Sequence, residues 1–141
     1  AIVDVGEIPW VAPFSVSVAF RMMHVIEDGT WGSTLWTVDA FCQVNGRDVP
    51  VQNSKVWPEA RVAAGQKYEI SWQETLSVVP GDQVACGTRA WLRDHVTSFQ
   101  SGGIGSMAPV TVQPGISAAQ TFNARNAKAS YAIDWVLSVV R

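Results

Sequence analysis

The chain has 141 residues and a mass of 15.3 kDa, which is the size of one domain with a substantial core. Hydrophobic residues make up 48% and charged residues only 16%, so the composition excludes an intrinsically disordered chain. The net charge of −2 and the scattered Lys and Arg residues argue against a nucleic-acid partner, and no apolar run reaches the roughly 18 residues of a membrane-spanning helix. The low charge fits either a surface covered in part by partners or strands with a Ser/Thr/Gln-rich face.

Residues 1–12 are interpreted as an extended apolar arm in front of a single domain over residues 13–141. The arm begins "AIVDVGEIPW", which lacks the basic start and apolar stretch of a signal peptide, so no signal peptide is expected in this chain. An extended terminus can add a strand to the edge of a neighbour's sheet. The arm therefore suggests contacts between subunits.

The remaining sequence consists of short runs rich in β-branched and aromatic residues, separated by turn signals such as "NG", "PGD" and "QPG". This spacing predicts an all-β antiparallel sandwich of about seven to nine strands. In the first run, residues 14–26, period-two alternation places Phe20 and His24 on one apolar face and Arg21 on the other. On that face His24 is interpreted as a hydrogen-bonded core or rim residue.

A first hairpin is predicted around the dipeptide Asn45-Gly46. Both residues tolerate the positive φ angles that a type I′ turn requires. Strands are therefore expected over residues 34–44 and from residue 47 to about residue 51.

A second hairpin is expected between residues 68–79 and 83–93, through a three-residue turn at residues 80–82. This turn pairs Trp72 with Ala90 and sets the apolar faces of both strands on the same side. A two-residue turn would set them on opposite sides. Because the register of a strand follows its buried face, the three-residue turn is the prediction.

The C-terminal residues 131–139 repeat the Tyr-x-Ile-x-Trp pattern of residues 68–72. Period two points the large aromatic side chains of both segments inward, so both are predicted to be core strands. Before the second copy, Ser117 opens a capping-box pattern among several alanines. This pattern favours at most one short helix near residues 117–128, or an irregular crossover, over a strand. The Gly-rich stretch at residues 101–107 is interpreted as a loop.

The two cysteines, Cys42 and Cys86, fall on inward faces of predicted strands. A disulfide between them is geometrically reasonable, and two buried free thiols are the alternative. Cys42, the tryptophan at Trp57 and "LSVVPGDQVAC" before the second cysteine resemble the immunoglobulin-type sandwich. The resemblance covers Cys42 to Trp91 and implies two antiparallel sheets joined by a disulfide. The family's tyrosine two residues before its second cysteine is Val84 here. The predicted fold class is therefore an Ig-like or jelly-roll-like β-sandwich, without the family's functions.

Motifs for catalysis or metal binding do not emerge from the sequence. His24 and His95 are the only histidines, and neither accompanies a Cys or Ser nucleophile in a recognisable pattern. The histidines and cysteines also lack the spacing of metal ligands. The sequence therefore predicts a protein that is not an enzyme and has neither a cofactor nor a metal.

The seven tryptophans are the most unusual feature of the composition. Alternation leaves several of them near turns or on a polar face, with Trp91 pointing outward between Arg89 and Arg93. Exposed tryptophan and arginine side chains are typical anchors of binding surfaces. The candidate interface residues are Trp10, Trp31, Trp57, Trp91, Arg89 and Arg93.

A non-enzymatic structural subunit that self-assembles is the preferred function, either a virion protein, for example of a phage, or an extracellular filament subunit. Its partners would be copies of itself or neighbouring structural proteins, bound through the sandwich faces and the extended termini. The alternative is a secreted, lectin-like module that binds a glycan through exposed tryptophans. A membrane-active sandwich ranks third. An extracellular or virion location is expected.

Overall fold

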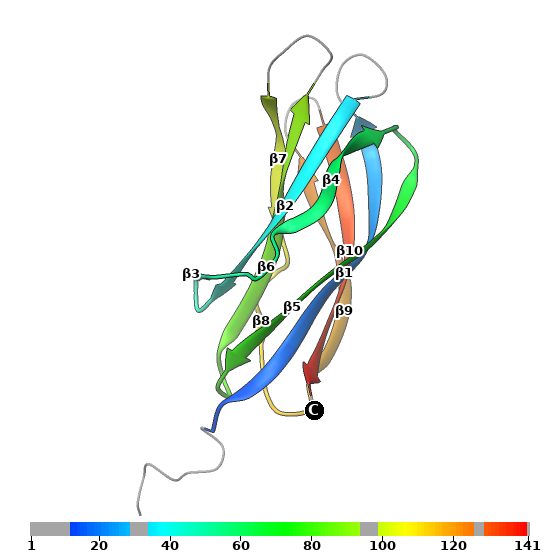
Figure 1. The fold of residues 1–141 in the computed structure, drawn as a ribbon. Helices are drawn as coiled ribbons and strands as arrows, with labels where there is room; N and C mark the ends of the chain where they lie inside the picture. The colour runs from blue at the N-terminus through cyan, green and yellow to red at the C-terminus, as the bar shows by residue number, and fades with distance from the viewer. Residues whose placement is uncertain (1–11, 29–33, 94–98, 126–128, 141) are drawn as a thin grey trace, which may run out of the picture.

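The computed structural model describes residues 12–28, 34–93, 99–125 and 129–140, which form ten β-strands and no helix (Figure 1). The prediction of an all-β antiparallel sandwich is confirmed. These ranges accordingly hold no helix that is long and apolar enough to cross a membrane. The expected N-terminal arm lies outside them except for its last residue. The strands are β1 (Phe14–Asp28), β2 (Thr34–Val44), β3 (Arg47–Val49), β4 (Lys55–Val62), β5 (Lys67–Val78), β6 (Gln83–Arg93), β7 (Phe99–Ser106), β8 (Val110–Thr111), β9 (Ser117–Arg125) and β10 (Ala129–Val140).

The strands form two packed layers along one continuous antiparallel path. β5, β1, β10 and β9 form the first layer, and β2, β6 and β7 form the second, with β3 and β4 beside β2 and β8 beside β6. Among the described residues, one pair joins the layers along one edge, Ile104 of β7 opposite Arg125 of β9. Ser15 stands opposite Val140, so β1 begins where β10 ends, at one end of the sandwich (Figure 1).

The repeated Tyr-x-Ile-x-Trp motif lies in β5 and β10, the two strands that flank β1. Phe20 of β1 stands opposite both Trp72 of β5 and Trp135 of β10. The rings of Phe20 and Trp72 are stacked with their centroids 4.4 Å apart, and all three side chains are buried. The prediction that both segments are core strands is confirmed. The motif recurs because both neighbours of Phe20 fill the same aromatic part of the core.

β1 changes the face that it buries part-way along its length. A register shift against both neighbouring strands marks a β-bulge at Arg21. Beyond the bulge Met23 is fully buried, whereas His24 is half-buried and Ile26 is 48% exposed. The prediction that His24 shares the apolar face of Phe20 is wrong, because one extra residue turns the side chains that follow it to the opposite face, as far as a second register shift at Ile26.

The Asn45-Gly46 hairpin is confirmed. Asn45 and Gly46 have φ angles of 54° and 77°, and the turn joins the end of β2 at Val44 to the start of β3 at Arg47.

The second predicted hairpin has the expected faces but the wrong partners. β5 pairs with β1 and β6 pairs with β2, so the two segments share no ladder. The turn between them crosses from one layer to the other: Gly81 has a φ of 93°, and the Asp82 amide donates to the Val79 carbonyl at 3.1 Å. Trp72 is 3% exposed and Trp91 is 38% exposed, as the alternation predicts.

Two strands lie where the sequence predicts a loop and a helix. β9 covers most of residues 117–128, and β7 covers most of the Gly-rich stretch. A Cβ added at Gly103 would lie 2.5 Å from the carbonyl carbon of Arg125, and one at Gly105 would meet the carbonyl oxygen of Asn123. β7 therefore approaches β9 closely because side chains are missing there. The helix prediction is wrong, since pairing of β9 with β10 along its whole length overrides the helix propensity of its alanines.

Cys42 and Cys86 form a disulfide between β2 and β6. The two residues stand directly opposite each other in the ladder, their Cα atoms are 4.0 Å apart, and both side chains are fully buried. The bridge of an immunoglobulin-type sandwich would join the two sheets. The resemblance therefore fails at this point, because here both cysteines belong to neighbouring strands of one layer.

Tyr131 of β10 connects the two layers through the core. Its hydroxyl lies 2.7 Å from the Thr88 hydroxyl of β6, and both side chains are fully buried. Burial raises the pKa of Tyr131 well above its ordinary value, because the phenolate would have to form without water. The hydrogen bond between the Tyr131 and Thr88 hydroxyls opposes this shift more weakly.

The raised pKa of Tyr131 predicts a loss of stability at alkaline pH. Only the folded state has the raised pKa. The contribution of protonated Tyr131 to the free energy of unfolding is therefore complete below the ordinary tyrosine pKa of about 10, and it declines as the pH rises above that value. Urea denaturation of the wild type and of Tyr131→Phe, each at neutral and alkaline pH, measures this component. An equal alkaline loss in the two proteins contradicts it.

Candidate functional site

Only some of the candidate interface residues reach the described surface. Trp10 and Trp31 lie outside the described residues, and so does the side chain of Arg93. Trp57 is half-buried, and the centroid of its ring lies 5.0 Å from that of Tyr68. Trp57 therefore belongs to the packing between β4 and β5 rather than to a free surface.

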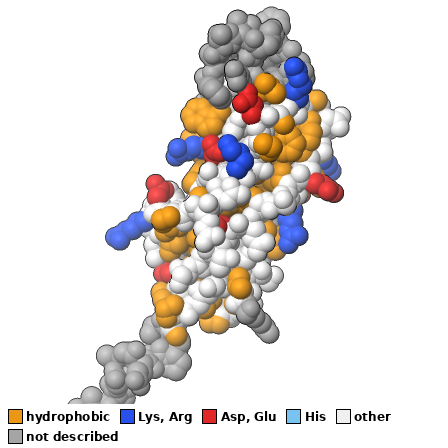
Figure 2. Space-filling model, in the orientation of Figure 1, with side chains coloured by type: hydrophobic (Ala, Val, Ile, Leu, Met, Phe, Trp, Pro, Cys, Tyr) orange, Lys and Arg blue, Asp and Glu red, His pale blue; other side chains and the backbone are white. Residues whose placement is uncertain are grey.

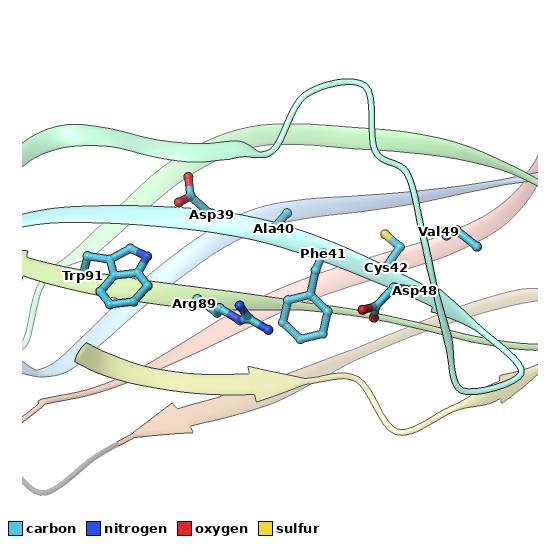
Figure 3. A pocket seen from close by; sticks show the side chains of 8 residues that line it. All are labelled: Asp39, Ala40, Phe41, Cys42, Asp48, Val49, Arg89 and Trp91. Carbon is cyan, nitrogen blue, oxygen red and sulfur yellow. The ribbon is translucent and has the colours of Figure 1, made fainter.

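Trp91 and Arg89 project outward from β6, and with Phe41 of β2 they line a hollow of about 400 Å³ (Figure 3). Trp91 and Arg89 share this face because they are two residues apart on one strand. The Arg89 guanidinium lies 5.5 Å from the centroid of the Phe41 ring, which is the geometry of a cation–π contact. The acidic side chains of Asp39 and Asp48 lie at the same hollow.

Both acidic side chains are already engaged by other residues. Asp39 forms an ion pair with Lys55 at 3.3 Å, and Asp48 accepts a hydrogen bond from the Gln43 amide at 2.9 Å. Within the described ranges Arg89 forms no ion pair, and its guanidinium rests on the aromatic ring beside it. The N–H donors of Arg89 are therefore available to an anionic ligand.

Arg89 begins a row of residues that stand side by side on neighbouring strands. Ile104 of β7 is opposite Arg89, and Arg125 of β9 is opposite Ile104. Directly opposed side chains project from the same face, so Ile104, which is 58% exposed, lies between two exposed arginines. We call Arg89, Ile104 and Arg125 the arginine row. It passes from the second layer to the first, because β7 and β9 are the strands that join them.

The rest of the described surface carries few charges. Figure 2 shows side chains of both charges scattered over a face that also carries uncharged polar and hydrophobic groups. In the first layer, β5 exposes Ser71, Gln73, Thr75 and Ser77. The low charge of the chain therefore has one source in polar, uncharged strand faces, and cationic side chains next to an exposed aliphatic one are a distinctive local feature.

Sequence reasoning misses two members of the arginine row. Ile104 falls in the expected loop, and Arg125 falls in the expected helix. The signal that could have placed Arg125 on a strand face is the alternation of buried Phe122 and Ala124 with exposed Asn123 and Arg125.

Comparison with known proteins bears on the fold. No family model and no curated protein sequence matches the chain. A C2 domain of a plant extended synaptotagmin 1 is 12% identical with a TM-score of 0.56, over 91% of this chain and 96% of that one. Another C2 domain is 9% identical with a TM-score of 0.51, over 89% of this chain and 99% of that one. The chain shares the fold of C2 domains.

Part of a much larger enzyme has the same fold. Human GIVD cytosolic phospholipase A2 is 11% identical with a TM-score of 0.59, over 92% of this chain. The chain spans only 16% of the length of that enzyme.

The likeness to C2 domains corrects the function expected from the sequence. Two of these three matching structures are C2 domains, and none of the three is a virion or phage protein, a filament subunit or a lectin. The predicted self-assembling structural subunit and its lectin-like alternative are therefore wrong. One argument for a surface covered by partner subunits was the low charge of the chain. The polar, uncharged face of β5 explains part of this low charge without a partner.

The described residues do not fit a metal site. One structure of the human phospholipase, 11% identical with a TM-score of 0.53, contains terbium chloride, and this chain covers 18% of it. In the part of this chain that the structure describes, no three His, Cys, Asp or Glu side chains come together. Asp28 accepts a hydrogen bond from the Ala64 amide at 3.1 Å, and Glu27 accepts one from the Ser130 hydroxyl at 3.3 Å. No role for a metal is derived.

Proposed function

We propose that this chain is a non-catalytic binding module that docks on the surface of a phospholipid bilayer. The observation that carries the proposal is the arginine row, in which an exposed isoleucine lies between two exposed arginines, with Trp91 on the same face of β6. The fold supports it, since the chain is similar to part of a phospholipase, an enzyme named for its action on phospholipids. The sequence alone ranks a membrane-active sandwich third, on the argument that exposed aromatic side chains also suit lipid interfaces.

The apolar members supply contact with the lipid. Ile104 is 58% exposed and Trp91 is 38% exposed, and both project from the outer side of the β6–β7 ladder. Tryptophan favours the depth of the lipid headgroups, where its ring meets apolar groups and its N–H stays near water. A strand face that lies on the bilayer would place both side chains at this depth.

The arginines supply contact with phosphate. A guanidinium can bind two phosphate oxygens at once, and it is more weakly hydrated than an ammonium group. A basic side chain near an anionic membrane contributes about 1 kcal/mol. The two arginines together therefore account for about 2 kcal/mol, or roughly 30-fold in affinity.

Replacing both arginines should weaken membrane binding by roughly this 30-fold. The variant is Arg89→Gln with Arg125→Gln, and the measurement is co-sedimentation with vesicles of phosphatidylcholine and phosphatidylglycerol in the presence of a chelator. The matched control is Arg21→Gln with Arg47→Gln, which removes the same charge from exposed positions on β1 and β3. We expect the control to bind within a few-fold of the wild type.

Two results would contradict the proposal. If the wild-type protein does not sediment with these vesicles at low ionic strength, the chain is not a membrane-docking module. If both double variants lose the same affinity, only net charge matters and the arginine row is not the site.

We propose in addition that the module works in an oxidising compartment. The support is the Cys42–Cys86 disulfide, since such bonds persist outside the reducing cytosol. The mass of the protein isolated from its native source under non-reducing conditions, with thiols blocked at lysis, tests this. Recovery of two alkylated cysteines would contradict it.

A further inference from the structure

A second hollow lies where the arginine row continues across the first layer. Ser130 of β10 stands opposite Arg125 of β9 on one side and opposite Glu27 of β1 on the other. The hollow measures about 430 Å³ and is lined by these three residues together with Ile26 and Asn123. The small side chain of the central strand leaves this space between two longer ones.

The two sides of this hollow carry opposite charges. Neighbouring strands are about 4.8 Å apart, so the Cα atoms of Arg125 and Glu27 are separated by about 10 Å across β10. No ion pair joins these two residues within the described ranges. Among the residues that the structure describes, Glu27 accepts one hydrogen bond, from the Ser130 hydroxyl to Oε1, which leaves its second oxygen available. The hollow therefore offers a cation and an anion to one ligand.

The apolar and neutral groups narrow the choice of ligand. Ile26 is 48% exposed and forms an aliphatic wall beside Glu27, and Asn123 exposes an amide beside Arg125. Tyr131 also lines the hollow, but it is fully buried and its hydroxyl is bonded to Thr88, so its ring offers no open aromatic surface.

We propose that this hollow binds the phosphoethanolamine headgroup of a bilayer lipid, with the phosphate on Arg125 and the ammonium group on Glu27. A primary ammonium has three N–H donors for a carboxylate, whereas the trimethylammonium group of choline has none. Choline is instead recognised by open aromatic rings, which this hollow does not present. The hollow is therefore expected to bind phosphatidylethanolamine in preference to phosphatidylcholine.

The inference rests on the proposed membrane docking and names the lipid at one end of the same row. A bilayer is favoured over a soluble phosphoethanolamine because the hollow is continuous with the exposed Ile104 of the arginine row through Arg125. A lipid held by Arg125 would lie beside the apolar side chain that the bilayer would cover.

The test compares uncharged vesicles of phosphatidylcholine with vesicles in which phosphatidylethanolamine replaces half of it, by co-sedimentation of the full chain. We expect about tenfold tighter binding to the mixed vesicles, the effect of one charge-assisted hydrogen-bonded pair. Glu27→Gln should remove this preference and keep binding to phosphatidylglycerol vesicles. Glu69→Gln, which removes an exposed charge from β5, should keep both.

Each outcome decides between the alternatives. Loss of the preference in Glu27→Gln alone supports the inference. Equal binding to both vesicle types overturns the inference. A preference for phosphatidylethanolamine vesicles that persists in Glu27→Gln also overturns it, since either result shows that the Glu27 carboxylate does not bind the ammonium group of the headgroup. Soluble phosphoethanolamine that binds, without any preference among vesicles, also overturns it in favour of a free metabolite. Failure of the proposed function is distinct, because the wild type would then ignore phosphatidylglycerol vesicles as well.

Discussion

Replacing Trp72 with alanine is expected to lower the free energy of unfolding by roughly 3–5 kcal/mol, the range for a large buried aromatic side chain. Trp72 is 3% exposed, stacks on Phe20, and donates its indole N–H to the Asn53 carbonyl at 2.6 Å. The substitution therefore opens a cavity beside Phe20 and leaves the Asn53 carbonyl without this donor. Trp91→Ala removes a side chain that is 38% exposed, so it should destabilise the protein by much less.

Urea denaturation followed by circular dichroism measures both variants, since fluorescence would mix the signals of seven tryptophans. We expect Trp91→Ala to unfold near the wild-type midpoint and to bind vesicles more weakly. A larger loss of stability in Trp91→Ala than in Trp72→Ala would contradict the assignment of the two faces. Trp72→Phe serves as a control that keeps a ring beside Phe20, and it should lose less stability than Trp72→Ala.

Which side of a strand is buried could be predicted from the sequence, because period two is a local property. Trp72, Trp91 and Tyr131 all lie on their predicted sides. The partner of each strand could not be predicted in the same way. A turn at Pro80 and Gly81 looks alike whether it closes a hairpin or carries the chain to the other layer. Pairing depends on residues distant in sequence, and several registers satisfy the same pattern.

The remaining failures have local causes that act through tertiary structure. The bulge at Arg21 reverses the face of β1, and nothing in the composition around it marks an extra residue. The glycines of β7 are typical of loops, yet Gly103 and Gly105 serve the close approach of β7 to β9. The alanines around Ser117 favour helix in isolation, and pairing with β10 overrides them.

The candidate site shows the same division between local and distant information. Arg89 and Trp91 were accessible to prediction, because alternation along one strand places both outward. The contribution of Ile104 and Arg125 depends on their positions opposite Arg89 and each other, on three different strands. Only the assembled sheet brings one arginine, an exposed isoleucine and a second arginine into one row. A surface made this way leaves no contiguous motif.

Removing the disulfide is the second change for which we expect a large effect. Cys42 and Cys86 are 44 residues apart, and closing a loop of this length lowers the entropy of the unfolded chain by an amount worth about 4 kcal/mol. The folded state gains little extra constraint from the bond, because β2 and β6 are already paired on both sides of it. The stabilisation should therefore arise mainly in the unfolded state.

The double variant Cys42→Ala with Cys86→Ala should thus keep its β-sheet circular dichroism and its vesicle binding while its urea midpoint falls. Thiol reduction of the wild type should produce the same shift without the loss of two buried sulfur atoms, which separates the cross-link from the packing. If the reduced protein unfolds at the oxidised midpoint, the bridge does not stabilise the fold. If reduction abolishes vesicle binding while the sheet persists, the bond also sets the geometry of the outer face. A loss of vesicle binding on reduction would be informative because Phe41 and Arg89 lie on β2 and β6, the two strands that the disulfide joins. These two residues also line the hollow beside Trp91.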